Sequence, residues 1–437
     1  MDRRTFLGLT ASSLVSLSAG YLPSVSASPA SRDDFLDDLQ RRCFRYFYEK
    51  TDPGTGLTLD RTAVDGTPYT LGRRPTASVT VTGFGLAAFC IAAERGWISR
   101  AEAANSARSA LRFFAHKAPH QMGWFYHWLH LRNGERAGAF SVTTDLSEVS
   151  TIDTSFLLAG ILTVREYFKE DREMTELADF IYRRVNFPWM LKENTLILSH
   201  GWTPEKRFIS YDWSEYSEAS LLYLLAIASP THPISPQAWY AWKRNPNVYG
   251  QYHYIGTTPL FTYQYSQAFF DFRHRKDRAG AGVDWFANSV TATRANRQFC
   301  IDLAKTFPGY SSDVWGITCS FSAQGYVAWG GPPLDLRIDG TVVPSAAGGS
   351  LMLAPEICLP ALQAMKLRFG SKIYGRYGFT DAFEPDGKWI SQDVLGLNLG
   401  ITLLSAENLR SGKLWSWFMA NPEAVRALAL AGFRPTD

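Results

Sequence analysis

Two kinds of segment are missing from this 437-residue sequence: runs of lysine or arginine and, after residue 27, any long apolar stretch. A formal net charge of +3 without a basic cluster gives no support for a nucleic-acid partner. A membrane-spanning helix needs ~20 successive apolar residues, so we expect no span in the mature chain. Since 46% of the residues are hydrophobic, the composition is typical of a globular protein.

Motifs for metals, nucleotides and serine nucleophiles are missing too. The histidines form no HExxH pair, and there is neither a GxSxG elbow nor a GxxxxGK[ST] loop. The five cysteines are scattered and form no CxxC, which argues against a zinc site. We therefore expect no cofactor and no metal, and we interpret the cysteines as buried thiols with at most one or two disulfides. They are Cys43, Cys90, Cys300, Cys319 and Cys358.

The N-terminus has the layout of a twin-arginine export signal. Arg3 and Arg4 precede the short, serine-rich apolar stretch "FLGLTASSLVSLSAGYL", and the small residues "VSA" end at Ala27. A chance Arg-Arg pair before a transmembrane helix is the alternative. We expect residues 1–27 to be a signal peptide, residues 28–437 to be the mature protein, and its location to be periplasmic or secreted.

Apolar residues recur at helical spacing along most of the chain. Some segments, such as "TSFLLAGILTV", are apolar on all sides and must be buried, whereas others, such as "AEAANSARSALRFFAHK", are amphipathic. About twelve such helices predict an all-α, single-domain fold: an (α/α)6 toroid whose inner ring is wrapped by an outer ring. A solenoid competes, but no repeat of fixed period supports it. Helices are expected near 33–50, 77–95, 99–116, 151–169, 172–187, 215–228, 235–245, 264–278, 284–305, 355–369, 394–408 and 413–431.

Four long loops connect these helices, at 118–150, 188–214, 246–262 and 306–354. Long loops without regular structure in a compact domain are usually functional. Strand-like stretches within them are short, as in "TLILSH" and "QGYVAWGG". In a toroid the pocket lies where the inner helices begin, so we expect functional side chains at those ends.

The stretch "YDWSEYSEASLLYLLAIAS" carries two glutamates at the entrance to an apolar run. Asp212 and Glu215 have the spacing of a capping box, so a structural role explains Glu215. Glu218 lies deeper among apolar neighbours, where an unpaired charge is costly. It should border a polar cavity with a raised pKa, as a general acid does, or else form a buried ion pair.

A second group of acids precedes another buried helix, in "TTDLSEVSTIDTSFLLAGIL". Asp153 is partly explained as a capping-box partner of Ser150. Asp145 and Glu148 lie in the preceding loop, at the expected rim of the pocket. Upstream, "GWFYHWLH" adds aromatic side chains that suit a sugar subsite. From this segment we predict substrate contacts by Trp124, Tyr126, His127 and Asp153.

Several stretches, from about residue 120 to 415, resemble the glycoamylase-like family, glycoside hydrolase family 144, which includes endo-β-1,2-glucanases. The resemblance implies an (α/α)6 barrel and inverting hydrolysis of β-1,2-linked glucan. It implies an acid role for Glu218, in the family's Y-x-E-A helix, and catalytic roles for Glu148 and Asp145. It also implies substrate contacts by Trp315, Asp381 and Asn398. The stretches include "STIDTSFLLAG", "YSEASLLYLLAIASPTHP", "PLFTYQYSQAFFDFRHRKD", "VWGITCSFSAQGYVAWGGPP", "YGRYGFTDAFEPDG" and "AENLRSGKLW".

One departure from the family pattern concerns the proton acceptor. Where family members commonly read G-I-D-Q-G-P, this chain reads "GLNLGI", with Asn398 at the aspartate position. An asparagine by itself cannot take a proton from water at neutral pH. Three readings follow: Glu148 or Asp145 is the base, a sugar hydroxyl replaces water in a transglycosylase, or the protein only binds glycan.

A further alternative is a polysaccharide lyase, in which Tyr216, His253 and Tyr254 would abstract a proton. In every reading the partner is an oligo- or polysaccharide, and we expect a monomer. The products separate the classes: a hydrolase yields new reducing ends, a lyase yields unsaturated ends, and a binding protein yields neither.

Overall fold

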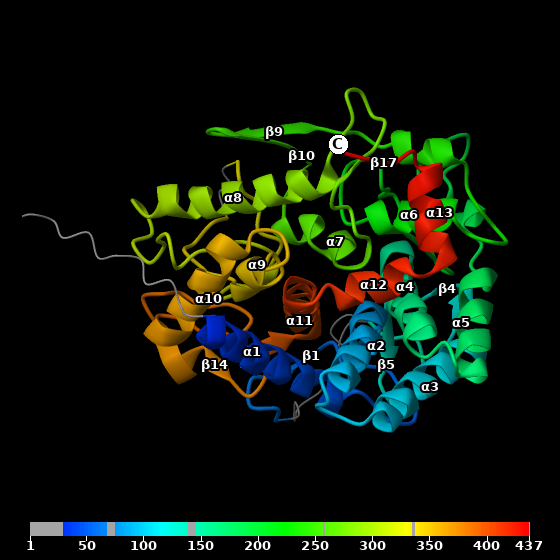
Figure 1. The fold of residues 1–437 in the computed structure, drawn as a ribbon, viewed down its shortest axis with the longest axis horizontal. Coiled ribbons are helices and arrows are strands. Elements are labelled where there is room, and N and C mark those ends of the chain that lie inside the picture. Colours follow the sequence, from blue (N-terminus) through cyan, green and yellow to red (C-terminus); the bar gives the residue numbers. More distant parts are fainter. Residues whose placement is uncertain (1–28, 68–74, 139–145, 257, 334–336, 437) are drawn as a thin grey trace, which may run out of the picture.

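The structure is a computed structural model that describes residues 29–67, 75–138, 146–256, 258–333 and 337–436. The predicted signal peptide and Asp145 lie outside these residues. The predicted mostly helical fold is confirmed, since thirteen α-helices form within them (Figure 1). They are α1 (Pro29–Lys50), α2 (Val79–Glu94), α3 (Arg100–His116), α4 (Thr151–Tyr167), α5 (Arg172–Arg184), α6 (Ser220–Ile227), α7 (Tyr265–Phe269), α8 (Trp285–Leu303), α9 (Pro344–Gly348), α10 (Pro355–Phe369), α11 (Gly396–Arg410), α12 (Lys413–Met419) and α13 (Pro422–Leu430).

The strands are short and pair antiparallel in small sheets between the helices. One sheet has three strands, β6 (Val149–Ser150), β7 (Gly201–Thr203) and β8 (Arg207–Phe208). The pair β1 (Arg61–Ala63) and β16 (Asp393–Leu395) joins segments more than 300 residues apart and leads directly into α11. The hairpin of β9 (Pro246–Tyr249) and β10 (Tyr252–Ile255) projects along one edge of the molecule (Figure 1).

Several predicted helices are shorter than expected. The helix predicted at 215–228 begins only at Ser220, and the one at 264–278 contains only α7. The segment 235–245 forms a short 3₁₀ turn, Pro236–Tyr240. The segment 413–431 is broken at Asn421, which is extended because the following proline disfavours the helical conformation of the residue before it.

All five cysteines are free, and Cys319 is the one that retains partial accessibility. The prediction of buried thiols is thus confirmed for the other four, and no disulfide is present among them. Within the part of the chain that the structure describes, no helix combines the length and apolar character needed to cross a membrane.

Helices α2 and α4 pack backbone to backbone at two glycines. A Cβ on Gly160 would lie 2.1 Å from the carbonyl oxygen of Gly83, and a Cβ on Gly83 would lie 2.4 Å from that of Phe156. Real Cβ atoms do not approach backbone so closely, so only glycine permits this contact. Both helices are buried along most of their length, as their uniformly apolar sequences predict.

Helix α11 lies in the middle of the molecule, with α1, α2, α7, α9 and α12 packed against it (Figure 1). A buried polar network ties it to α1 and α2. The carboxylate of Glu407 is fully buried, and it accepts hydrogen bonds from Arg95 Nε and Nη2, each at 3.0 Å, and from Gln40 Nε2 at 3.0 Å. These three donors satisfy a charge that would otherwise be costly to bury.

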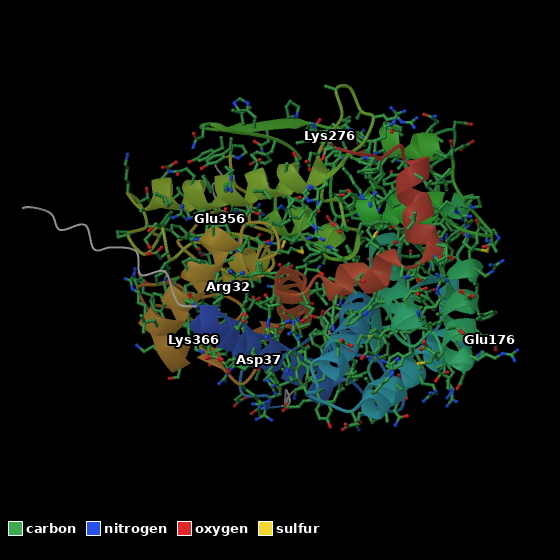
Figure 2. The ribbon with its side chains drawn as sticks, in the orientation of Figure 1. Arg32, Asp37, Glu176, Lys276, Glu356 and Lys366 are labelled. Atoms are coloured by element: carbon green, nitrogen blue, oxygen red, sulfur yellow. The ribbon has the colours of Figure 1, made fainter. Side chains whose placement is uncertain are left out.

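The outer helices carry charged side chains toward solvent (Figure 2). Lys366 of α10 donates to Asp38 of α1 at 2.8 Å, and Glu356 of α10 accepts from Arg294 of α8 at 2.9 Å. Exposed pairs of this kind contribute only ~0–1 kcal/mol each, so the glycine contact and the buried network matter more for stability.

Gly160→Ala tests the helix contact. The added methyl group would meet the Gly83 carbonyl, so we expect the free energy of unfolding to fall by at least ~1–3 kcal/mol. Gly375→Ala is the matched control, because no atom lies within 4 Å of a Cβ at that position. Urea unfolding measures both, and equal midpoints for the two variants would refute the contact.

Candidate functional site

Side chains from the starts of several helices come together at one place. Thr80 Oγ1 in the first turn of α2 donates to Asp153 Oδ1 in the first turn of α4 at 2.6 Å. Ser266 Oγ of α7 donates to the carbonyl oxygen of Glu218, just before α6, at 2.6 Å. The phenol of Tyr265 interacts electrostatically with Glu218, Asp153 and Asp381, which puts these three acids in the neighbourhood of one side chain.

Glu218 occupies the turn that leads into α6, and its side chain is half-buried. Burial raises the pKa of its carboxyl to about 7, and the charge of Asp153 adds to this effect. The raised pKa expected from the sequence is therefore confirmed. A carboxyl that keeps some accessibility while its charge is desolvated lies in a recess, where it can hold a proton at neutral pH.

Glu215 does not have the capping role that its spacing predicts. Since α6 begins at Ser220, its N-cap position is Ala219, which makes no side-chain cap. Glu215 is exposed, and its Oε1 lies 3.6 Å from Lys243 Nζ. Asp212 does not cap the helix either, because its Oδ2 forms an ion pair with Lys192 Nζ at 2.7 Å. The prediction failed because the turn before α6 is held by Ser266 from α7, which is 45 residues or more away along the chain.

His127 lies between two of the predicted acids. Its Nδ1 is 3.1 Å from Glu148 Oε1, and its Nε2 is 3.3 Å from Asp153 Oδ1. Burial opposes the charge, but Asp153 and Glu148 together raise the pKa of His127 to about 9. Despite its own burial, Glu148 has a lowered pKa because His127 donates to it. We interpret the three side chains as an imidazolium clamped by two carboxylates.

The same three side chains are close enough to be considered for a metal ion, with ligand atoms within 4.8 Å of one another. Their orientation does not suit chelation. The two carboxylates face different nitrogens of one ring, and a metal ion binds a single ring nitrogen. Asp153 is also occupied by Ser150 Oγ at 2.5 Å and by Thr80. An ion-pair network fits this geometry better than a metal site.

Asp381 and Asn398 form a second polar group. Asp381 follows β15 (Gly378–Phe379), and Asn398 lies in the first turn of α11. Asn398 Nδ2 donates to Asp381 Oδ1 at 2.7 Å, and the Phe321 backbone N–H donates to Asp381 Oδ2 at 2.7 Å. Burial raises the pKa of Asp381 to about 7, against the opposing effect of these hydrogen bonds.

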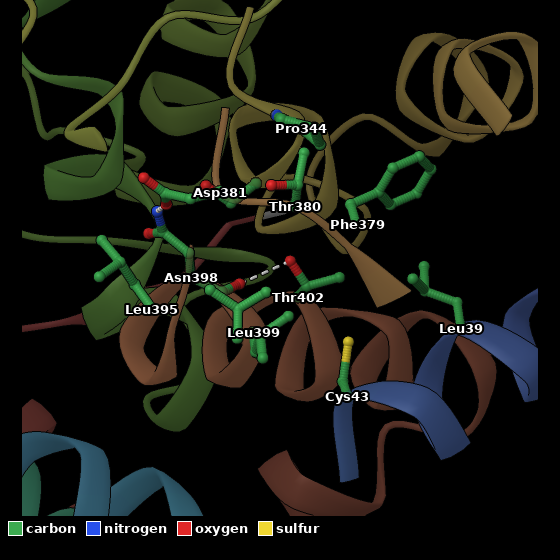
Figure 3. Close-up of a pocket in the computed structure, with 12 residues that line it drawn as sticks. Leu39, Cys43, Pro344, Phe379, Thr380, Asp381, Leu395, Asn398, Leu399 and Thr402 are labelled. Atoms are coloured by element: carbon green, nitrogen blue, oxygen red, sulfur yellow. Dashed lines mark hydrogen bonds between the residues drawn. The ribbon is translucent and has the colours of Figure 1, made fainter. Parts of the chain in front are cut away.

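Figure 3 shows the amide nitrogen of Asn398 turned toward Asp381. Below the pair, toward α1, lies a small cavity of about 20 Å³, room for roughly one water molecule. The hydroxyl of Ser345, which lines this cavity, has no hydrogen-bond partner among the described residues. Asp381 and Asn398 both contribute to the lining of this cavity.

Tyr326 adds an accessible aromatic ring near these acids. Its ring is 49% exposed, desolvation raises its pKa well above the usual value, and it interacts electrostatically with Cys319, Tyr265 and Asp381. A groove of about 360 Å³ is lined by residues 210–217, which end next to Glu218 in the sequence and include the exposed Tyr211.

Two of the predicted substrate-binding residues are instead part of the core. Trp124 and Trp315 have no exposed surface, so neither can stack on a sugar. Trp124 donates its indole N–H to Asn186 and packs against Phe187. Tyr126 is half-buried beneath the guanidinium of Arg136. Burial of this kind is set by tertiary packing, which the local sequence does not reveal.

The residues of the lyase alternative do not assemble. His253 is exposed on β10, and the adjacent Tyr254 is buried, because neighbouring strand residues face opposite sides. Tyr216 stacks on Trp285, and burial raises its pKa far above the usual value, which makes it a poor base. This geometry removes the support for the lyase reading.

Four residues of the site were not predicted from the sequence: Thr80, Tyr265, Cys319 and Tyr326. Thr80 lies two residues after Ser78, the N-cap of α2, so its position in the first turn was open to prediction. The other three belong to stretches that resemble the family, but nothing in their spacing sets them apart. Their placement depends on contacts between α7, α11 and the loop that contains Cys319.

Comparison with known proteins shows which proteins this chain resembles. The Glycoamylase family model matches residues 210–422. An exo β-1,2-glucooligosaccharide sophorohydrolase of Parabacteroides distasonis is 28% identical over 93% of this chain, and the chain spans 58% of its length. An endo-β-1,2-glucanase of Chitinophaga pinensis, solved with sophorotriose and glucose, is 29% identical with a TM-score of 0.83 over 92% of this chain and 98% of its own. A β-1,2-glucanase of Parabacteroides distasonis gives 27% identity and a TM-score of 0.82 over 92% of this chain and 60% of its own.

The imidazolium clamp predicts a pH-dependent contribution to stability. The folded pKa of His127 lies above the unfolded value of ~6.5, so its ion pairs stabilise fully below pH 6.5. This stabilisation is lost as the pH rises through about 9. We expect His127→Gln to lower the free energy of unfolding at pH 6 and to have a much smaller effect at pH 10. Denaturation of both proteins across this range measures the difference, and a pH-independent gap would contradict the clamp.

Proposed function

We propose that the chain is a glycoside hydrolase of the glycoamylase-like family and that it acts on β-1,2-linked glucan. One observation carries this proposal: Glu218, with a pKa raised to about 7, lies in a recess within the family match. Three relatives named for β-1,2-glucan or its oligosaccharides support the linkage. The exposed ring of Tyr326 and the groove of residues 210–217, with Tyr211, offer the aromatic surface that a glucan needs.

We also propose the (α/α)6 toroid for the arrangement of the helices, as one domain. Its support is the order of the contacts: α2 packs on α4, α4 on α6, and α11 on both α2 and α9. Amphipathic helices lie outside this series, with α3 and α5 against α2 and α4, and α13 against α6. The candidate site then lies at the ends where inner helices begin.

For the chemistry we propose inverting hydrolysis with Glu218 as the general acid. Its protonated carboxyl would give a proton to the glycosidic oxygen as the bond to the anomeric carbon breaks. Inversion also requires a base on the opposite face of the sugar, ~6.5–9.5 Å from the acid, with room for water. Glu148 is one candidate because it stays ionised beside His127, and Asp145, outside the described residues, is another.

The amide at position 398 supports a second candidate function. If no carboxylate activates water, a sugar hydroxyl could be the acceptor and the protein would transfer glycosyl groups, or it could bind glycan without cleaving it. Incubation with β-1,2-glucan distinguishes these functions. New reducing ends in proportion to bonds cleaved indicate hydrolysis, changed chain lengths without new reducing ends indicate transfer, and binding without products indicates a glycan-binding protein.

Glu218→Gln tests the acid. An amide is far too weak an acid to protonate the glycosidic oxygen, so we expect sugar release from β-1,2-glucan to fall at least ~100-fold while the fold is retained. In the wild type, activity should fall as the pH rises through about 7, because Glu218 then loses its proton. Glu215→Gln is the comparison, three residues away and exposed on the groove, and it should lower turnover far less than Glu218→Gln does. A larger loss at Glu215 than at Glu218 would reverse this assignment.

We further propose that the protein is exported by the twin-arginine route, on the strength of Arg3, Arg4 and the apolar stretch that follows. Replacement of both arginines by lysine should keep precursor in the cytoplasm, because the paired guanidinium groups are the recognised feature. Cell fractionation with immunoblotting measures the precursor. Unchanged export of the double variant would refute the proposal.

A further inference from the structure

Asn398 holds the position at which the family resemblance implies an aspartate, and its contacts define what its amide can do. Nδ2 donates to Asp381 Oδ1 at 2.7 Å and to the backbone oxygen of Cys319 at 3.3 Å. Both amide hydrogens are therefore engaged. Asn398 is 8% exposed, more than Asp381, and its carbonyl oxygen Oδ1 is the part of the side chain that can accept a hydrogen bond from a water molecule.

Asp381 has the opposite combination of properties. It is only 3% exposed, so it makes little direct contact with water. Burial, with a small contribution from the charge of Asp393, raises the pKa of its carboxyl, although Phe321, Asn398 and Arg61 favour the charged form. A carboxylate in this environment takes up a proton more readily than an exposed aspartate does. What it lacks is a direct path for that proton.

We propose that Asn398 and Asp381 together serve as the general base, with the amide of Asn398 relaying the proton of the attacking water to Asp381. The proposal rests on the hydrolytic function proposed above. As the water oxygen bonds to the anomeric carbon, its proton moves to Asn398 Oδ1. At the same time a proton leaves Asn398 Nδ2 for Asp381 Oδ1, so the amide becomes its neutral imidic acid form.

The leaving sugar takes its proton from Glu218 as its bond to the anomeric carbon breaks. The protein then holds one proton more on the Asn398–Asp381 pair and one fewer on Glu218. Asp381 returns its proton to Nδ2, Oδ1 gives its proton to solvent, and Glu218 takes one from solvent. Every atom and charge is restored without an added oxidant, reductant or metal.

Two features of the site favour this relay over other bases. An isolated amide cannot keep the water's proton, but here the amide never carries a net charge, because it passes on one proton as it receives another. Glu148 is clamped to His127, which lowers its pKa and weakens it as a base. Asp381 and Glu218 also both interact electrostatically with Tyr265 and Cys319, so the pair and the proposed acid belong to one electrostatic neighbourhood.

The decisive experiment exchanges the two side chains. Asp381→Asn removes the final proton acceptor, so we expect turnover on β-1,2-glucan to fall at least ~100-fold with substrate binding retained. The double variant Asp381→Asn/Asn398→Asp should recover most of the activity, because the carboxylate at 398 takes the proton directly. It keeps one amide, one carboxylate and the same net charge, and the amide at position 381 can still accept from Phe321 and donate to residue 398.

A solvent isotope measurement separates a relay from a purely structural pair. The rate is plotted against the deuterium fraction of H₂O–D₂O mixtures. This plot should be more strongly curved for the wild type than for the exchanged variant, because the exchanged variant moves one proton fewer in the step. This comparison stands even if Asp381→Asn alone fails to fold. Identical curves, or an exchanged variant that is folded, binds glucan and stays inactive, would overturn the relay.

Glu218→Gln, measured in the same assays, distinguishes an error in the proposed relay from an error in the proposed function. Loss of activity in Glu218→Gln with normal activity in Asp381→Asn overturns the relay alone. A wild type that releases no sugar from β-1,2-glucan overturns both. Loss in both single variants with recovery on exchange supports both.

Discussion

The close contact of α2 with α4 is the constraint on which the site depends. Two glycines bring the helix backbones together, and this sets the positions of the first turns of both helices. The hydroxyl of Thr80 can then reach Asp153, and Asp153 in turn faces His127 from the loop that follows β4 (Trp124–Phe125). A side chain at either glycine would move the helices apart and would displace a carboxylate that takes part in the charge distribution of the site.

That charge distribution divides the acids into two kinds. Glu148 and Asp153 share the His127 cation, and its charge keeps the pKa of Glu148 low. For Glu218 and Asp381 burial is the largest influence, and it raises both pKa values to about 7. The site therefore combines Glu148, whose pKa a cation lowers, with two carboxyls that exchange a proton near neutral pH, one as the proposed acid and the other, through Asn398, as the proposed base.

The most accurate predictions from the sequence concern features that are set by residues close together in the chain. Helix α10 has the predicted bounds because Pro355 at its start and Gly370 after its end are local signals. The raised pKa of Glu218 also followed from an apolar helix directly after it. The pairing of Asp381 with Asn398 joins two separate elements, and the start of α6 depends on Ser266 of α7. Neither feature could be predicted from residues that are neighbours in the sequence. Trp124 was misassigned because a loop tryptophan beside acids has the same local pattern whether it faces a cleft or the core.

The buried network around Glu407 has a consequence for synthesis of the chain. Gln40 of α1 donates to Glu407 and to the Leu403 carbonyl of α11, partners 367 and 363 residues away. At ~5–20 residues per second, a ribosome needs roughly 20–70 seconds to add that much chain. For this interval Gln40 lacks both partners, so the contact between α1 and α11 forms only after most of the chain has been made. A protein with a twin-arginine signal, which we propose here, suits such an order of events, because that route carries chains that have already folded.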